Sequence, residues 1–173
     1  MYRLRVFYRK EGMGRFISEK NLHRNIERIL RRMELPLKFT EGFSPHPKIS
    51  FGSPLPVGIT GVNERFDVFL VKSIDTASFL ENSKDFLPEG IIFTATEWID
   101  ITAPSITSME TSAIYTIETS KDIDIEYFNN TGKVLEYTDK KIVVLFKINK
   151  LSHKKLIELL VNGNIISITR EIL

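Results

Sequence analysis

YRLRVFYRKEGMGRFISEKNLHRNIERILRRM, residues 2–33, passes from a strand pattern to a helix pattern. In residues 2–9 the apolar side chains of Leu4, Val6 and Tyr8 alternate with positions that are mostly arginine, which predicts a strand with a basic face. Apolar residues at 22, 26, 29, 30 and 33 then fall on one face of a helix over residues 19–33. Ser18 stands where a helix N-cap is expected. The chain is therefore predicted to begin with a strand and an amphipathic helix.

The segments that follow complete an order of elements that is typical of one domain type. Pro36 ends the helix, and residues 37–40 have the pattern of a short strand. Residues 65–72 and 91–99 are predicted to be strands, with a helix over residues 75–86 between them. The order β-α-β-β-α-β is the split βαβ of a ferredoxin-like domain, which we assign to residues 1–102.

Residues 103–173 are predicted to repeat this order as a second, smaller domain. After a linker at 103–109, strands are predicted at 112–119, 133–137, 141–148 and 165–172, and helices at 122–129 and 153–161. We therefore expect an α+β fold of two tandem ferredoxin-like halves with antiparallel sheets. A single larger α+β sheet is the alternative.

The composition excludes several classes of site. The chain has 173 residues, no cysteine and three histidines, which removes thiolate zinc sites, iron–sulfur clusters and cysteine nucleophiles. We expect no metal and no cofactor. No run of about 18 apolar residues occurs, and the first ten residues lack the apolar core of a signal peptide, so we expect a cytoplasmic protein that does not cross a membrane.

Positive charge is concentrated in the first 50 residues, which hold 12 Lys and Arg against 5 Asp and Glu. The predicted first helix carries Arg24, Arg28 and Arg31 on one face, with Arg32 beside them, and the first strand carries Arg3 and Arg5. Guanidinium groups suit phosphate because they offer a bidentate donor fork. The pattern predicts an RNA- or anion-binding face, and an ordinary solvated helix face is the alternative.

Residues 42–61, GFSPHPKISFGSPLPVGITG, hold four of the nine glycines and four of the seven prolines. A long loop with alternating proline and glycine is stiff and is often functional. His46 lies between two prolines, so it is held extended and is the candidate general acid–base group. Phe43, Ser44 and Lys48 are the candidate binding residues beside it. The alternative is that the loop only packs, with Phe43 and Phe51 as anchors.

Residues 16–58, FISEKNLHRNIERILRRMELPLKFTEGFSPHPKISFGSPLPVG, closely resemble the radical SAM-linked protein family. The matched positions include the four helix arginines, the Gly-Phe-x-Pro-His-Pro run and the Pro-Leu-Pro-x-Gly run. These bacterial domains occur fused to, or encoded beside, radical SAM enzymes, often near RNA-processing and ribosomal genes. Glu19 and Asn21 stand where the family pattern has histidine and aspartate.

The resemblance implies an accessory module for a radical SAM enzyme, which presents RNA or another anionic substrate to that partner. Two alternatives remain open from the sequence. One is a metal-independent endoribonuclease or transferase that uses His46. The other is a protein–protein scaffold that binds no nucleic acid. Because the chain has no cysteine, it is not itself a radical SAM enzyme, and we expect a binding protein rather than an enzyme.

Overall fold

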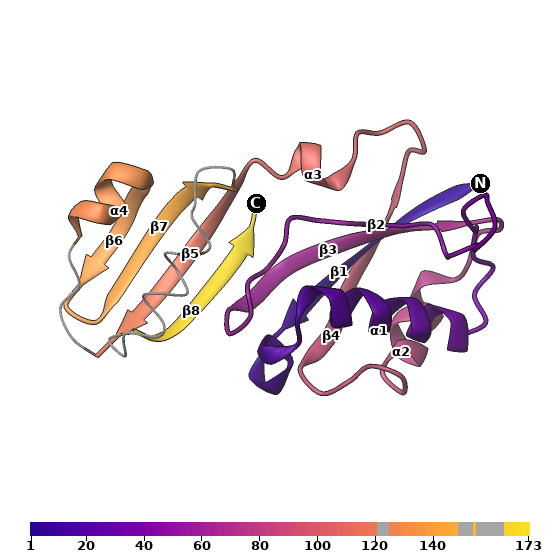
Figure 1. The fold of residues 1–173 in the computed structure, drawn as a ribbon, viewed down its shortest axis with the longest axis horizontal. Helices are drawn as coiled ribbons and strands as arrows, with labels where there is room; N and C mark the ends of the chain where they lie inside the picture. The colour runs from indigo at the N-terminus through magenta and orange to yellow at the C-terminus, as the bar shows by residue number, and fades with distance from the viewer. Residues whose placement is uncertain (121–124, 149–153, 155–164) are drawn as a thin grey trace.

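The computed structural model describes residues 1–120, 125–148, 154 and 165–173. It shows a mixed α+β fold with an eight-stranded, mostly antiparallel sheet in the strand order β4-β1-β3-β8-β5-β7-β6, with β2 beside β3 (Figure 1). The α+β class predicted from the sequence is confirmed. Both halves contribute to the one sheet, because β3 of the first half pairs in parallel with β8 of the second at Thr60–Val62.

The first half contains β1 (Tyr2–Lys10), a 3-10 turn η1 (Gly12–Phe16), α1 (Glu19–Arg32), β2 (Ile49–Phe51), β3 (Thr60–Leu70), α2 (Thr76–Ser83) and β4 (Ile91–Ile99). Its strands are ordered β4-β1-β3-β2, and each neighbouring pair is antiparallel. The predicted first helix is confirmed. The Ser18 hydroxyl accepts a hydrogen bond from the backbone N–H of Asn21, which caps α1 as expected.

The second half contains α3 (Ile106–Met109), β5 (Ser112–Thr119), α4 (Glu126–Thr131), β6 (Lys133–Thr138), β7 (Lys141–Lys147) and β8 (Ile165–Ile172). Its strands are ordered β8-β5-β7-β6, again with antiparallel neighbours. The helix predicted over residues 153–161 lies outside the described residues, apart from the helical Lys154. The predicted linker at 103–109 includes the short helix α3.

The predicted strand at 37–40 is wrong. Leu37 and Phe39 form only isolated bridges, to Leu70 and Pro47. Past the Leu37–Leu70 bridge, the same edge of β3 is paired with β2 at Val68, so the segment at 37–40 cannot extend along it. The second strand of the half is β2 instead, because Ile49–Phe51 pairs with Phe66–Val68 of β3.

Two hydrophobic cores lie in the molecule. Apolar residues of α1 and α2, such as Leu22, Ile26 and Phe79, pack on the face of β1 that carries Leu4 and Val6. The second core belongs to residues 113–172, but it also takes in Leu55 and Ile59 from the region between β2 and β3. The predicted long loop at 42–61 is therefore divided into an exposed tip, β2 and a buried connection to the second half.

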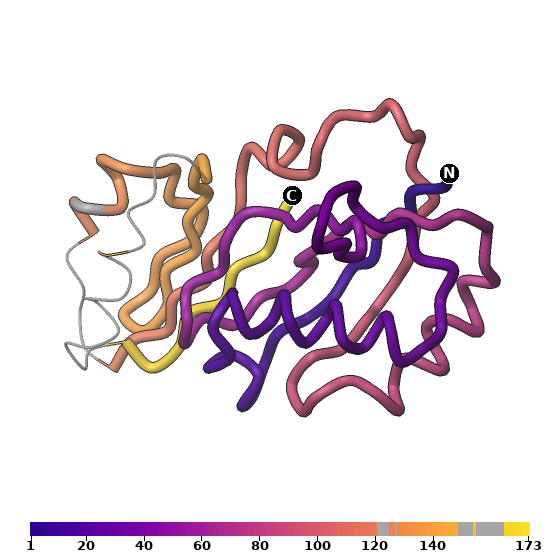
Figure 2. The backbone as a smooth tube through the Cα atoms, turned by 45° about the vertical axis from the view of Figure 1, so that its right-hand side comes forward, coloured from indigo at the N-terminus to yellow at the C-terminus, as the bar shows by residue number. Residues whose placement is uncertain are grey.

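The chain between β4 and β5 crosses the sheet on the side away from α1 and α2 (Figure 2). The helices α1 and α2 cover one face of β1, and this crossing segment covers part of its other face. Within the described part of the chain, no helix has the length and hydrophobicity that spanning a membrane requires.

Candidate functional site

The outer face of α1 carries a row of cations. Five of its basic residues are exposed: Lys20, Arg24, Arg28, Arg31 and Arg32. Residues four apart on a helix lie on one face, about 6 Å apart along the axis. The hydrophobic residues of α1 face the sheet, so this side of the helix is turned to solvent. The row predicted from the sequence is therefore present on the surface.

The arginines of this row differ in their partners. Among the described residues, Arg24 has no hydrogen bond or ion pair, and Arg28 donates only to the neutral side chain of Asn25, at 3.2 Å. Arg31 pairs with Glu27 at 3.0 Å, and Arg32 lies over the ring of Phe86. Arg24, Arg28 and Arg32 thus have no carboxylate partner among the described residues, and of these three only Arg32 is stacked on an aromatic ring.

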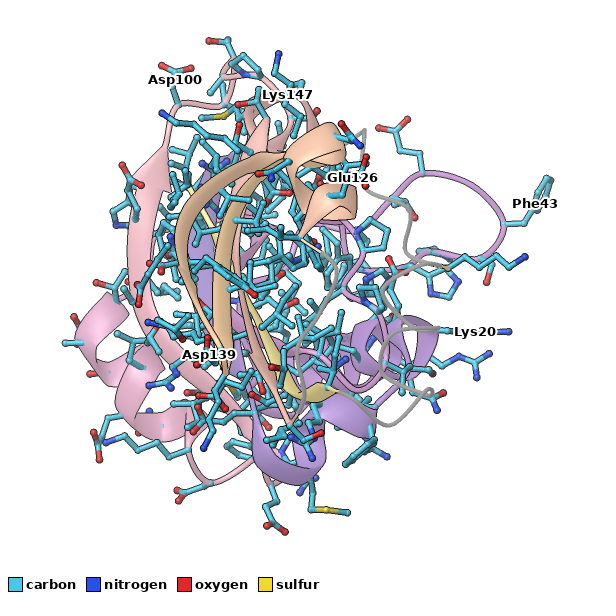
Figure 3. All side chains as sticks on the ribbon, turned by 90° about the vertical axis from the view of Figure 1, so that its left-hand side faces the viewer. Lys20, Phe43, Asp100, Glu126, Asp139 and Lys147 are labelled. Carbon is cyan, nitrogen blue, oxygen red and sulfur yellow. The ribbon has the colours of Figure 1, made fainter. Side chains whose placement is uncertain are left out.

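The tip of the loop lies beside the middle of α1. Figure 3 shows Phe43 and Lys20 projecting from the same side of the molecule, and the side chain of Phe43 is fully exposed. The backbone N–H of His46 donates to the Thr40 hydroxyl at 3.1 Å, and the N–H of Thr40 donates to the carbonyl of His46 at 2.8 Å. Gly42, with φ of +122°, provides a conformation that other residues rarely adopt.

His46 contacts groups at both of its ring nitrogens. Its Nδ1 lies 3.4 Å from Glu27 Oε1 on α1, and its Nε2 lies 3.5 Å from the Ser44 hydroxyl. The side chain remains 62% exposed. The Glu27 carboxylate, the imidazole and the Ser44 hydroxyl are therefore in successive contact, in an exposed position. Of the loop residues predicted from sequence, His46 contacts α1 through Glu27 and Ser44 contacts His46, while the fully exposed Phe43 projects into solvent.

Lys48 is directed elsewhere. Its ammonium nitrogen lies 4.7 Å from the centre of the Phe69 ring, and the guanidinium of Arg3 lies 5.8 Å from the same ring. Because Phe69 pairs with Arg3 across β1 and β3, Lys48 belongs to the neighbourhood of β1 rather than to that of His46.

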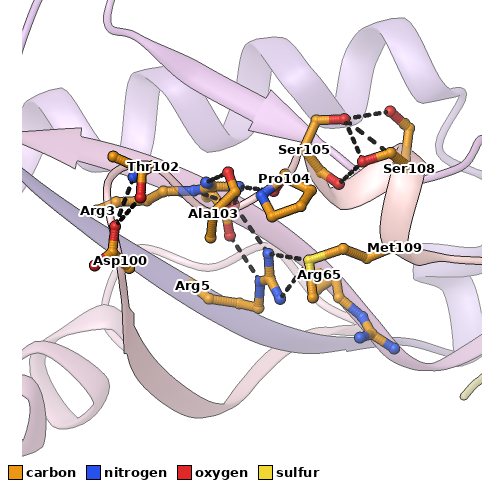
Figure 4. A network of polar contacts seen from close by, with 12 residues as sticks. Arg3, Arg5, Arg65, Asp100, Thr102, Ala103, Pro104, Ser105, Ser108 and Met109 are labelled. Carbon is orange, nitrogen blue, oxygen red and sulfur yellow. Dashed lines mark hydrogen bonds and ion pairs between the residues drawn. The ribbon is translucent and has the colours of Figure 1, made fainter.

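Arg3 and Arg5 do not lie on an exposed basic face, which corrects the prediction for these two residues. Both are buried, and the carboxylate of Asp67, with 0% exposure, accepts from Arg3 Nε at 2.7 Å and from Arg5 Nε at 2.9 Å. Arg3 also donates to the carbonyls of Ala103 and Pro104 in the crossing segment (Figure 4). These arginines fasten the crossing segment to the sheet and are closed to a ligand.

A second buried ion pair connects the two halves. Arg170 of β8 donates to both carboxylate oxygens of Glu64 on β3, at 2.9 and 2.6 Å, and to the carbonyls of Ser53 and Pro54. Burial raises the pKa of Glu64, while the charge and hydrogen bonds of Arg170 oppose that rise. For residues 52–59, the alternative of a packing segment is therefore the one the structure supports.

Two further titratable groups lie near this pair. Lys10 is buried and donates to the carbonyl of Ile17 at 2.7 Å, and burial lowers its pKa. The ring of His23 stacks on Phe51 with 3.6 Å between centroids. Burial lowers the pKa of His23, although the charge of Glu19 acts in the opposite direction. Both groups hold structural positions.

No group of three or more His, Asp or Glu side chains in the described ranges is placed to hold a metal ion. The exposed surface made by the cationic row of α1 and by Phe43, Ser44 and His46 is named the α1–loop surface below. It offers guanidinium and ammonium donors, an aromatic ring and an imidazole, a set that suits a polyanion carrying flat groups.

Comparison with known proteins gives a family but no activity. Residues 3–160 match the family described as "Uncharacterized protein conserved in bacteria (DUF2344)". No curated protein matches the sequence. Among solved structures, the chain is similar to the acetolactate synthase small subunit from Thermotoga maritima, with 15% identity over 99% of this chain and 93% of that one. The TM-score is 0.32, and a score of this size supports no statement about shared fold or function.

Proposed function

This chain belongs to the DUF2344 family of proteins conserved in bacteria, and on that premise we propose that it is a cytoplasmic accessory module that binds RNA through its α1–loop surface. The observation that carries the proposal is the exposed row of cations on α1, in which Arg24 and Arg28 have no carboxylate partner among the described residues.

Physical chemistry favours a phosphate backbone as the ligand of this row. Neighbouring arginines repel each other on an empty helix, and an anion that lies along them removes that repulsion. Each phosphate contact also releases counterions, so several regularly spaced cations give strong binding at low salt. The exposed ring of Phe43, which projects from the same side of the molecule as Lys20, adds a place where a base can stack.

The partner enzyme is part of the same proposal and rests on the sequence resemblance of residues 16–58 to the radical SAM-linked family. Since the chain has no cysteine, the partner would have to supply the iron–sulfur cluster. We also infer that both halves are ferredoxin-like units. The strand orders β4-β1-β3-β2 and β8-β5-β7-β6 support this inference, because each places the last strand of its half beside the first.

A binding experiment with matched charge removal tests the proposal. A fluorescein-labelled single-stranded RNA is titrated with the wild type, with Arg24→Ala/Arg28→Ala/Arg31→Ala, and with Lys72→Ala/Lys133→Ala/Lys140→Ala. The control variant loses the same charge from exposed residues outside α1 and the loop. If each arginine contacts one phosphate, the α1 variant should bind roughly 100-fold more weakly at 0.1 M salt. Equal losses in the two variants would contradict the proposal.

A second candidate function is metal-independent RNA cleavage, which the contacts of His46 favour. A histidine between a carboxylate and a hydroxyl can act as a general acid–base group. Glu27 would hold the imidazole, at 3.4 Å, while Nε2 faces Ser44. End-labelled RNA is incubated with the wild type and with His46→Ala. New fragments that appear only with the wild type support cleavage, and the same result from both proteins removes this candidate.

A third candidate is a scaffold that binds the partner enzyme without nucleic acid. Exposed apolar side chains gather where β1 begins and β4 ends: Met1, Tyr2, Trp98 and Ile101. The rings of Tyr2 and Trp98 meet edge to face at 6.0 Å. Purification in high salt with added ribonuclease would retain a partner held by such a surface, and Trp98→Ala should release it. Loss of the partner on ribonuclease treatment alone would instead indicate an RNA link.

A further inference from the structure

A groove runs along the N-terminal half of α1, at the end of the α1–loop surface away from Phe43. Its lining includes the apolar side chains of Met13 and Phe16 from η1 and the polar side chains of Asn21, Arg24, Asn25 and Arg28 from α1. The groove has a volume of about 650 Å³ and is open to solvent. One wall is thus hydrophobic and the opposite wall is polar and positive.

The hydrophobic wall is exposed although its backbone is firmly held. Met13 is 65% and Phe16 is 52% exposed. The turn that carries them is fixed by hydrogen bonds from the N–H of Glu11 to Gly90, from Lys10 Nζ to Ile17, and from the N–H of Gly58 to Arg15. An aromatic ring on an anchored turn can receive a ligand at little cost in conformational entropy.

Close packing beneath the turn supports this rigidity. A Cβ atom added to Gly14 would lie 2.4 Å from the carbonyl oxygen of Gly90, so only glycine allows the two backbones to approach this closely. The guanidinium of Arg15 lies 4.9 Å from the centre of the Phe16 ring. The backbone that carries Phe16 is thus held closely, and its half-exposed ring is in contact with the guanidinium of Arg15.

The polar wall offers two kinds of group at helical spacing. Arg24 and Arg28 supply positive charge that no carboxylate among the described residues neutralises. Asn21 and Asn25, also four residues apart, supply amides that can both donate and accept hydrogen bonds. A ligand that fills the groove therefore needs an anionic group, a flat apolar face and polar edges within one short segment.

We propose that this groove binds an unpaired nucleotide of single-stranded RNA, with its base on Phe16, its polar edge toward Asn21 or Asn25, and its flanking phosphates on Arg24 and Arg28. This inference rests on the proposed function and specifies its substrate as single-stranded. A duplex fits less well because its bases are stacked on one another and their faces are not available to an aromatic side chain.

The groove and the loop tip are separated by a defined length. Glu27, beside His46, is nine positions along the chain from Ser18, at the groove, which corresponds to about 14 Å of helix. At about 3.4 Å per stacked nucleotide, roughly four nucleotides bridge that distance. Affinity should therefore rise with oligonucleotide length until both Phe16 and Phe43 are reached, and a strand of ten nucleotides is long enough for the test.

The test compares three probes and two pairs of variants. The probes are a single-stranded RNA of ten adenosines with one 2-aminopurine, the duplex of the same strand with its complement, and inorganic polyphosphate, which has charge but no bases. Phe16→Ala removes the proposed stacking ring, and Phe16→Leu keeps apolar volume without an aromatic face. Tyr137→Ala and Tyr137→Leu on β6 are the matched controls, since Tyr137 is also an exposed aromatic residue.

We expect Phe16→Ala to weaken binding of the single strand about 5- to 150-fold, the range that loss of one stacked base gives, with 2-aminopurine quenching lost. The affinity of Phe16→Ala for polyphosphate should stay within about twofold of the wild-type value. Both Tyr137 variants should bind the single strand like the wild type. The wild type should bind the single strand more tightly than the duplex. Unchanged single-strand binding by both Phe16 variants would overturn the inference, as would an equal loss for polyphosphate.

The proposed function and this inference fail in different ways. If the wild type binds neither RNA nor polyphosphate, or if Arg24→Ala/Arg28→Ala/Arg31→Ala binds RNA as tightly as the wild type, the proposed function itself is wrong. If the wild type binds both probes with strong salt dependence but does not quench 2-aminopurine, the cationic row is correct and the base-binding groove is refuted.

Discussion

Asp67→Asn is expected to be among the most damaging conservative substitutions in this protein. Asp67 is completely buried and accepts three hydrogen bonds from two arginines: from Arg3 Nε at 2.7 Å, and from Arg5 Nε and Nη2 at 2.9 and 3.1 Å. Asparagine keeps the shape but removes the charge. It leaves two buried guanidinium groups without a carboxylate, and breaking a buried pair in this way costs about 3–5 kcal/mol.

The assay is urea unfolding followed by circular dichroism, with thermal unfolding as a second measure. For a chain of this length, a loss of about 3–5 kcal/mol corresponds to a decrease in Tm of roughly 6–20 °C. Glu81→Gln is the control, because Glu81 is 72% exposed and its ion pair is with the neighbouring, exposed Lys84. Its free energy of unfolding should change by less than about 1 kcal/mol.

A triple substitution by apolar residues separates the effect of the buried charges on stability from the effect of packing. Replacing the three residues together, as Arg3→Met/Arg5→Met/Asp67→Leu, removes all of the charge in this Arg3–Arg5–Asp67 network and should recover most of the lost stability. Its affinity for RNA should equal that of the wild type, since these arginines are closed to ligands. If Asp67→Asn costs less than about 1 kcal/mol, the buried network does not hold the crossing segment as described.

Two further predictions concern the junction of the halves. Arg170→Met should lower the free energy of unfolding by about 3–5 kcal/mol, because Glu64 and the carbonyl of Ser53 lose their buried donor, and hydrogen exchange at residues 53–59 should speed up. Burial lowers the pKa of His23, so the unfolded chain binds the proton more tightly and stability should fall as the pH drops from 7 through about 6.5. His23→Gln should flatten that part of the stability curve, and an unchanged curve would show that His23 does not cause it.

The regular elements with strong periodicity could be predicted from the sequence. In α1 the spacing of Leu22, Ile26 and Ile29 fixes which face is buried, and this leaves Arg24 and Arg28 on the outside. The surface row of the candidate site was therefore within reach of sequence reasoning. His46 could be assigned to an extended, exposed position because of the two prolines around it, whereas the sequence left Phe43 as either a binding residue or a packing anchor, and its full exposure excludes the anchor.

The buried charges could not be predicted in the same way. Alternation in β1 places Arg3 and Arg5 on one face but does not say what covers that face. The cover comes from Ala103 and Pro104, about 100 residues later in the chain. A charged residue within an apolar strand, such as Asp67, is a visible signal of a buried pair. Its partner lies more than 60 residues away and cannot be chosen from a single sequence.

The most direct test of the α1–loop surface is the salt dependence of RNA binding. The logarithm of the association constant is plotted against the logarithm of salt concentration for the wild type and for Arg24→Ala/Arg28→Ala/Arg31→Ala. A single strand loses a slope of about 0.7 for each phosphate contact, so the variant should have a slope smaller in magnitude by about 2. Identical slopes for the two proteins would contradict the assignment of α1 as the phosphate-binding element.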